Sequence, residues 1–279
     1  MSESARTLSF VMPENACNAH LHIIDPAFPN DGKAAAQIGT VETYRTVADS
    51  LSLPRAVFVQ AKPFALDNTC LLDAIQKFGP HCARGIAVVD NTVSDAELER
   101  LHEGGVRGLR FSVWNPNNAV VSFDDCKPLS ERVKHLGWNM QLHMSAAQIA
   151  QQADVIRSLD CKVVIDHMGR LDPALGVKDP AYSFLCEMVD RGNTWIKLSG
   201  PYLNTKTGEP WEDATRTAIA DFDLLNVAGV VPDGIKSNRE EVALLDRVRS
   251  RSIADNGRLD SLSHKYRQPA CLKAQGWGS

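Results

Sequence analysis

The feature that most constrains this fold is a series of short apolar runs, rich in β-branched residues, that alternate with segments of helical periodicity. Continuous apolar runs are typical of strands that are buried on both faces of a parallel sheet. The intervening segments, such as 70–78 and 95–103, carry apolar residues at helical spacing among charged ones. We therefore expect seven β/α repeats, with strands at 17–22, 56–60, 84–89, 106–113, 139–143, 162–167 and 195–199.

Seven repeats with room for an eighth favour one α/β architecture, the (β/α)8 barrel of the TIM type, over a doubly wound open sheet. The chain has 279 residues, of which 44% are hydrophobic, and single barrels of this type have about 250 residues. A linker rich in Pro, Gly or Ser does not interrupt the chain. We expect a single domain over residues 1–279, with a polar loop at 204–212 after the seventh strand.

Charge and composition argue against several classes of protein. The net charge of −4 comes from interspersed acids and bases, which leaves no basic stripe for a nucleic-acid backbone. The first ten residues lack the pattern of a leader, and no later run approaches the roughly 20 apolar residues of a membrane span. The seven cysteines are scattered singly, which argues against a disulfide framework or a thiolate zinc cluster. The sequence predicts a cytoplasmic protein that binds neither nucleic acid nor membrane, and it leaves the oligomeric state open.

A His-x-His pair, His20 and His22, ends the first apolar run. Alternate side chains of a strand share a face, so both imidazoles should point the same way, together with Asn18. Such a pair can clamp one metal ion. A half-buried strand can also carry two hydrogen-bonded histidines without any metal, so the motif alone leaves both interpretations open.

Polar or ionisable residues end six of the expected strands, where a barrel of this type places its catalytic groups. These residues are His20 and His22, Gln60, Arg110, His143, His167, and Lys197 with Ser199. Four imidazoles from the first, fifth and sixth strands can converge on one divalent ion. The remaining histidines lie in helical or loop contexts and are expected to be solvated: His81, His102, His135 and His264.

At these residues the chain resembles the amidohydrolase superfamily, and within it the amidohydrolase-2 branch that includes sulfomuconolactone hydrolases and 2-pyrone-4,6-dicarboxylate lactonases. The resemblance covers about residues 10–215 and rests on the order and spacing of six stretches. They are Asn18 to His22, Val59 and Gln60 with Asp67 to Leu72, Gly105 to Phe111, Gln141 to His143, Ile165 to Arg170, and Trp195 to Gly200.

The resemblance implies a hydrolase acting on a carboxylic ester bond, namely a lactonase. Its expected substrate is an anionic lactone, carboxylated or sulfonated, of the muconolactone type found in aromatic degradation, such as 4-sulfomuconolactone. Two alternatives remain: a sugar-acid lactone isomerase and a catalytically weakened lactone-binding barrel. The expected cofactor is zinc, although imidazoles can also hydrogen-bond a lactone carbonyl without metal. The expected ligands, which are also catalytic candidates, are His20, His22, His143 and His167.

Arginines near the strand ends are the candidates for binding an anionic substrate. The guanidinium groups of Arg110 and Arg170 match the planar geometry of carboxylate or sulfonate oxygens. Surface salt bridges are the alternative for both side chains. Gln60 and the hydroxyl of Tyr202 complete the predicted substrate-binding set.

The chain departs from the family pattern at two places. Asn18 stands where the family usually has Asp, which removes a charge but keeps an oxygen. The family's strand-eight stretch, Trp-Gly-Ser/Thr-Asp-Trp-Pro-His, is replaced by the unrelated segment 221–233. We expect an irregular eighth strand, with Asp233 after the apolar run 227–231 as the catalytic base and Asp223 as the second candidate.

Overall fold

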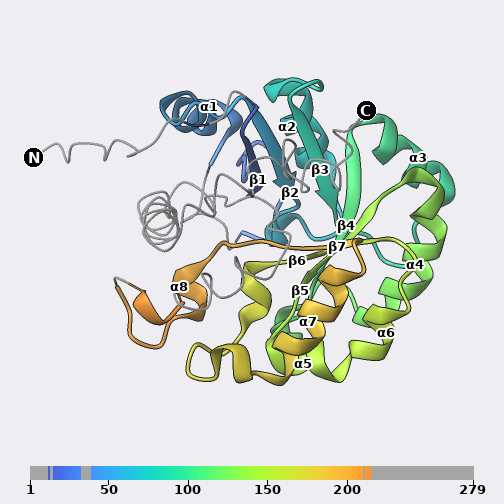
Figure 1. Ribbon diagram of the computed structural model, residues 1–279. Coiled ribbons are helices and arrows are strands. Elements are labelled where there is room, and N and C mark those ends of the chain that lie inside the picture. Colours follow the sequence, from blue (N-terminus) through green and yellow to red (C-terminus); the bar gives the residue numbers. More distant parts are fainter. Residues whose placement is uncertain (1–11, 13–14, 33–38, 210, 215–279) are drawn as a thin grey trace, which may run out of the picture.

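The computed structural model describes residues 12, 15–32, 39–209 and 211–214, which form a parallel sheet with helices on its outside (Figure 1). Every pair of neighbouring strands is parallel, and the strands follow one another in chain order. The strands are β1 Cys17–Leu21, β2 Arg55–Val59, β3 Ala83–Ala87, β4 Val106–Ser112, β5 Asn139–His143, β6 Lys162–Ile165 and β7 Thr194–Ile196.

Helices connect successive strands, and several of them begin at a side chain that caps a free backbone N–H group. Ser94 accepts a hydrogen bond from the backbone of Glu97 at the start of one helix, and Ser145 forms a capping box with Gln148 at another. The helices are α1 Val41–Ser50, α2 Thr69–Phe78, α3 Asp95–Glu103, α4 Cys126–Val133, α5 Ala146–Gln151, α6 Ala153–Arg157, α7 Pro180–Asp190 and α8 Pro201–Asn204.

The seven predicted strands and the two predicted helices are confirmed, with ends that differ by at most a few residues. The sheet is curled, because Nδ1 of His20 in β1 lies 3.1 Å from Nζ of Lys197, which follows β7, although these strands stand at opposite ends of the strand order. The structure is thus a seven-stranded curled half-barrel. The predicted eighth strand lies outside the described residues.

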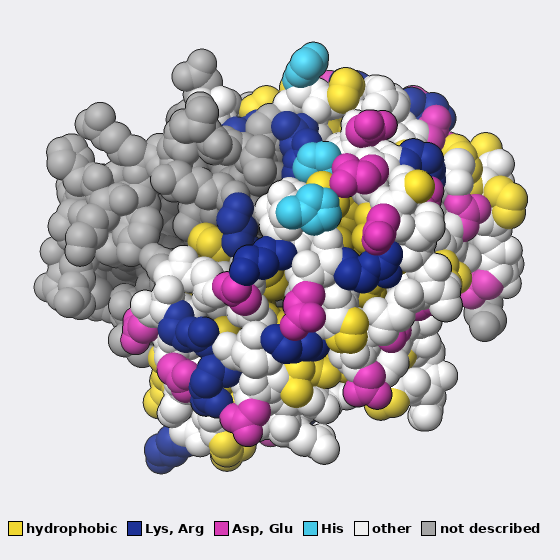
Figure 2. Space-filling view, turned by 90° about the vertical axis from the view of Figure 1, so that its right-hand side faces the viewer, with side chains coloured by type: hydrophobic (Ala, Val, Ile, Leu, Met, Phe, Trp, Pro, Cys, Tyr) yellow, Lys and Arg dark blue, Asp and Glu magenta, His cyan; other side chains and the backbone are white. Residues whose placement is uncertain are grey.

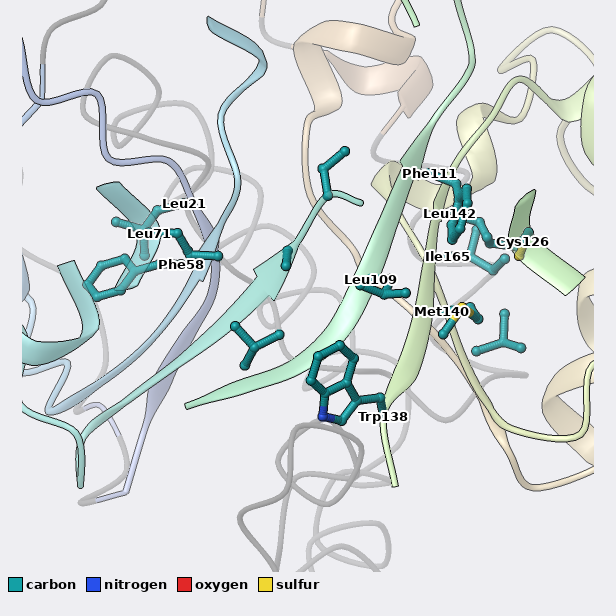
Figure 3. Close-up of a cluster of buried hydrophobic side chains, with 14 of the residues drawn as sticks. Leu21, Phe58, Leu71, Leu109, Phe111, Cys126, Trp138, Met140, Leu142 and Ile165 are labelled. Carbon is teal, nitrogen blue, oxygen red and sulfur yellow. The ribbon is translucent and has the colours of Figure 1, made fainter. Parts of the chain in front are cut away.

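An apolar layer fills the space between the sheet and the helices. Outward-facing strand residues such as Phe58, Leu109 and Met140 pack there against helix residues such as Leu71 and Cys126 (Figure 3). A smaller apolar cluster lies on the other face of the sheet and lines the inside of the curl. It consists of Ala19, Val57, Val59, Ile86, Val164 and Trp195. The polar groups of the candidate site, such as Arg110, His143 and Lys197, lie toward the carboxyl end of the sheet.

Charged side chains of both signs are interspersed on the face shown in Figure 2. Within the described residues, no helix combines the length and the apolar character that crossing a membrane requires. His81 and His135 are exposed as predicted. His102 corrects that prediction: it is half-buried, and its Nδ1 accepts a hydrogen bond from Trp138 Nε1 at 2.9 Å. His264 lies outside the described residues.

Candidate active site

His20 of β1 and His22, which directly follows that strand, face each other at the carboxyl end of the sheet. A bulge in the pairing of β1 with β2 falls between Asn18 and Leu21, and the Nε2 atoms of His20 and His22 lie 3.4 Å apart. Nδ1 of His22 lies 2.8 Å from the carbonyl oxygen of Val59. A carbonyl can only accept, so His22 carries its proton on Nδ1 and directs the lone pair of Nε2 at His20.

Asn18 does not join the two imidazoles in the way expected from strand alternation. Its Oδ1 accepts a hydrogen bond from the backbone N–H of His20 at 3.2 Å. The side chain is therefore turned toward its own strand, where it satisfies a backbone donor at the bulge.

A buried cluster of charged and polar groups lies behind His20. Asp166 follows β6 directly, and its Oδ2 accepts hydrogen bonds from Arg110 Nε at 3.2 Å and Gln141 Nε2 at 3.1 Å. Its Oδ1 lies 3.4 Å from both Lys197 Nζ and His20 Nδ1. Four strand ends thus place their polar side chains around one carboxylate.

Asp166 is ionised in this cluster. Burial alone would raise the pKa of its carboxyl group, but the charges of Lys197 and Arg110 outweigh burial and hold that pKa well below its usual range. A buried carboxylate is stable only where partners replace its hydration, and here cations and amide groups replace it.

His143, at the end of β5, has one engaged and one open nitrogen. Its Nδ1 lies 3.0 Å from Ser112 Oγ and 3.5 Å from Arg110 Nη2. Its Nε2 is buried, and no hydrogen-bond partner for it is found among the described residues. Burial and the neighbouring Arg110 both lower the pKa of His143, so the ring is neutral near pH 7.

His167 opens the short 3-10 segment His167–Arg170 in a strained backbone conformation. Its φ is 51°, and Met168 and Arg170 also have positive φ, a region that residues with a Cβ rarely adopt. Asn204 Nδ2 donates to the carbonyl of His167 at 2.9 Å, and the ring Nδ1 lies 2.9 Å from Ser199 Oγ. These two contacts stabilise the strained turn and fix the orientation of the ring.

A side chain larger than hydrogen at Gly200 would disturb this arrangement. Gly200 has a φ of +66°, and a Cβ placed on it would lie 3.1 Å from Nδ1 of His167. The glycine therefore permits both the left-handed turn and the close approach of the imidazole.

The four predicted histidines form one contiguous group of rings. Ring centroids lie 5.1 Å apart for His20 and His22, 5.0 Å for His20 and His167, and 4.9 Å for His143 and His167. One ligand atom from each of His20, Asp166 and His167 lies within 4.8 Å of the others. Buried imidazole and carboxylate donors in this number fit a divalent ion such as zinc.

Arg170, at the end of the 3-10 segment that follows β6, forms the rim beside these rings. The Cζ atom of Arg170 lies 4.2 Å from the ring centroid of Trp114, and Nη2 donates to the carbonyl of Leu203 at 3.3 Å. Nη1 is buried, and the described residues offer it no hydrogen-bond partner. Burial lowers the pKa of Arg170. Tyr202, half-buried in α8, lies close enough to oppose this shift in part.

Gln60 and Arg110 line a small cavity together with Lys62 and Ser112. Nε2 of Gln60 donates to the carbonyls of Ala65 and Asp67 and so holds the loop after β2. Lys62 is half-buried, and its pKa is lowered by burial and by Arg110. It adds a second cation beside Arg110 that the sequence reasoning did not single out.

Sequence reasoning also missed Asp166, Gln141, Ser112 and Trp114. For Asp166 a signal existed, since it is a lone acid directly after the apolar run 163–165, the position that had drawn attention to His167. The predicted base Asp233 and its alternative Asp223 lie outside the described residues.

A comparison with models of protein families identifies the family of this chain. The model of the amidohydrolase family matches residues 17–224. This chain belongs to the amidohydrolase family. The match spans all seven strands and every histidine of the site.

Curated relatives are identical to this chain at about a quarter to a third of the aligned positions. A 2-pyrone-4,6-dicarboxylate hydrolase of Comamonas testosteroni is 32% identical over 217 residues, which cover 76% of this chain and 71% of the relative. A 4-sulfomuconolactone hydrolase of Rhizobium radiobacter is 28% identical over 221 residues, covering 76% and 73%. A crystal structure of a putative 2-pyrone-4,6-dicarboxylic acid hydrolase from Pseudomonas putida has a TM-score of 0.72 at 22% identity, covering 96% of this chain and 100% of that one. This similarity concerns the fold alone.

Proposed function

We propose that this amidohydrolase is a lactonase that hydrolyses an anionic lactone. The observation that carries the proposal is the group of four buried or half-buried imidazoles, backed by an ionised Asp166. Arg170 borders this group, and its Nη1 has no hydrogen-bond partner in the part of the chain that the structure describes. The two curated relatives support it, since one is named for a lactone with two carboxylates and the other for a sulfonated lactone.

The chemistry of ester hydrolysis assigns tasks to this site. Water attacks the lactone carbonyl carbon, negative charge develops on the carbonyl oxygen, and the ring C–O bond breaks as its oxygen takes a proton. Arg110 can only donate, so its approach to Nδ1 of His143 favours the tautomer with the proton on Nε2. In the metal-free site, that buried N–H would donate to the carbonyl oxygen as its charge grows.

Zinc is the proposed cofactor. The donors that would hold it are the predicted imidazoles of His20, His22, His143 and His167, with Asp166 as the carboxylate that the geometry adds. Bound zinc polarises a carbonyl group or acidifies a water molecule. The hydrogen bond of His22 Nδ1 to the carbonyl of Val59 is the outer contact that orients an imidazole for such a role.

The acidic groups of the substrate would be bound by the cations at the rim. Arg170 is the better candidate, because its buried Nη1 would gain a partner. Arg110 already pairs with Asp166 at 3.2 Å, so it serves the internal network first. Lys62, whose Nζ donates to Asn118 Oδ1 at 2.8 Å, would bind a second carboxylate or sulfonate. Gln60 and Tyr202 would complete the substrate contacts.

The base that activates water is proposed to be Asp233, on an eighth strand that closes the half-barrel into a (β/α)8 barrel and a single domain. General-base assistance is worth about a hundredfold to ten-thousandfold in rate. Asp233→Asn should therefore lower turnover strongly while leaving the unfolding transition unchanged.

The decisive experiment is a turnover screen of carboxylated and sulfonated lactones, each paired with its neutral ester analogue. We expect hydrolysis of at least one anionic lactone, with solvent oxygen from heavy-oxygen water appearing in the product acid. A product without solvent oxygen would indicate isomerisation. Binding of the lactones without turnover would indicate a ligand-binding barrel.

A further inference from the structure

Lys197, fully buried beside β7, is the most unusual residue of the site. Its Nζ lies 2.8 Å from Gln141 Oε1, 3.1 Å from His20 Nδ1 and 3.4 Å from Asp166 Oδ1. A buried ammonium must replace its hydration with acceptors. Two of these contacts are hydrogen bonds, to Gln141 Oε1 and His20 Nδ1, and the third is an ion pair with the ionised Asp166, so Lys197 is positively charged in the folded protein.

This ammonium determines which nitrogen of His20 carries a proton. Lys197 and the Nε2 amide of Gln141, at 3.5 Å, both present donors to Nδ1 of His20. Asp166 is the competing acceptor, and at 3.4 Å it is farther from Nδ1 than Lys197 is. Nδ1 of His20 therefore accepts a hydrogen bond, and its proton resides on Nε2.

The other side of the ring agrees with this tautomer. Nε2 of His20 faces Nε2 of His22, which is an acceptor because His22 donates from Nδ1 to the carbonyl of Val59. The hydrogen bonds then run in one direction, from Lys197 through both imidazoles to the carbonyl. Among the described residues, each imidazole N–H in this relay has an acceptor.

We propose that Lys197 is a resident cation that lowers the affinity of this site for divalent metal, by its charge and by holding the proton of His20 on Nε2. A metal at His20 Nε2 requires that proton to leave, and a metal at Nδ1 would displace the ammonium. In both cases a divalent ion must also share Asp166 with an existing positive charge. The proposal does not depend on the identity of the lactone.

The test is the zinc affinity of metal-stripped protein, measured near neutral pH by competition with a chromogenic chelator. Lys197→Met keeps a straight side chain but removes the charge, and Lys197→Arg keeps the charge. We expect Lys197→Met to lower the zinc dissociation constant by about ten- to a hundredfold, the range typical of groups that contact metal ligands. We expect no such gain from Lys197→Arg or from Lys127→Met, which alters an exposed lysine.

An unchanged or weaker zinc affinity in folded Lys197→Met would overturn the proposal. Should that variant fail to fold, the unaltered metal-free protein decides the question. Nitrogen chemical shifts of labelled histidine distinguish the two tautomers, with the His20 signals assigned by their loss in His20→Gln. A proton on Nε2 of His20 supports the proposal, and a proton on Nδ1 contradicts it. Neither measurement involves lactone turnover, so a failed turnover screen leaves both outcomes interpretable.

Discussion

Two regions of the sheet, the apolar layer under the helices and the polar cluster at the carboxyl end, are stabilised by different kinds of interaction. In the apolar layer under the helices, Phe58, Leu109 and Met140 are held by non-directional burial, whose strength follows area and fit (Figure 3). At the carboxyl end, Asp166 and Lys197 are equally buried but depend on individual donors and acceptors. Loss of one apolar contact removes only part of the stabilising energy of the layer. Loss of one partner of a buried charge leaves that charge unpaired, which costs much more free energy.

This comparison predicts that the largest effect follows from removing the central charge. Asp166→Asn leaves Arg110 and Lys197 buried without their counter-ion, which should cost about 3–5 kcal/mol of the free energy of unfolding. Urea unfolding measures this loss, and lactone turnover should fall by at least about a hundredfold, as expected when interactions in a preorganised site are broken.

The matched control is Asp154→Asn, because the Asp154 side chain is 99% exposed. This variant should change the free energy of unfolding by less than about 1 kcal/mol. If Asp166→Asn were as stable as Asp154→Asn, the buried charges would not depend on each other as described.

The next effect should separate stability from activity. Leu101→Ala in α3 opens a cavity in the apolar layer and should cost about 2–5 kcal/mol in urea unfolding. Turnover per folded molecule should stay the same. Leu175→Ala, at a side chain that is 48% exposed, is the control and should be nearly neutral. A loss of turnover in folded Leu101→Ala would show that the two regions are coupled.

A smaller effect should distinguish the two arginines. Arg170→Ala should raise the KM for an anionic lactone by about ten- to a hundredfold, as loss of a charge-assisted hydrogen bond does, and barely alter a neutral analogue. Arg110→Ala should impair both substrates, because Arg110 holds Asp166. Steady-state kinetics on a matched substrate pair measures both. Equal losses for Arg170→Ala would assign that residue to structure.

Acid should destabilise the metal-free protein through His143. Its folded pKa lies below the ordinary value, so below about pH 6.5 the unfolded chain takes up a proton that the folded protein does not. The free energy of unfolding should therefore fall by up to about 1.4 kcal/mol per pH unit from this group as pH decreases from about 6.5. Urea unfolding at several pH values should show a shallower slope in His143→Gln. His135→Gln, at an exposed ring, should retain the parent slope.

Sequence patterns predicted those features that depend on near neighbours in the chain. The seven strands follow from local apolar runs, and the histidines were found because they stand where such runs end. The partners of those histidines could not be found in this way. His20 meets Lys197 across 177 positions, and Arg110 meets Asp166 across 56. The positive φ of His167 likewise depends on contacts with Asn204, which periodicity does not encode.

The contact between His20 and Lys197 also affects the order of events during synthesis and refolding. A ribosome adds about 5–20 residues per second, so the 177 positions between these residues correspond to about 10–35 seconds of synthesis. During that interval the imidazole of β1 exists without the ammonium that later sets its tautomer. Contacts of such high sequence separation also form slowly when an intact chain refolds. Recovery of the His20 tautomer should therefore be among the last signals to return after dilution from denaturant, later than the burial of Trp138, whose partner His102 is only 36 positions away.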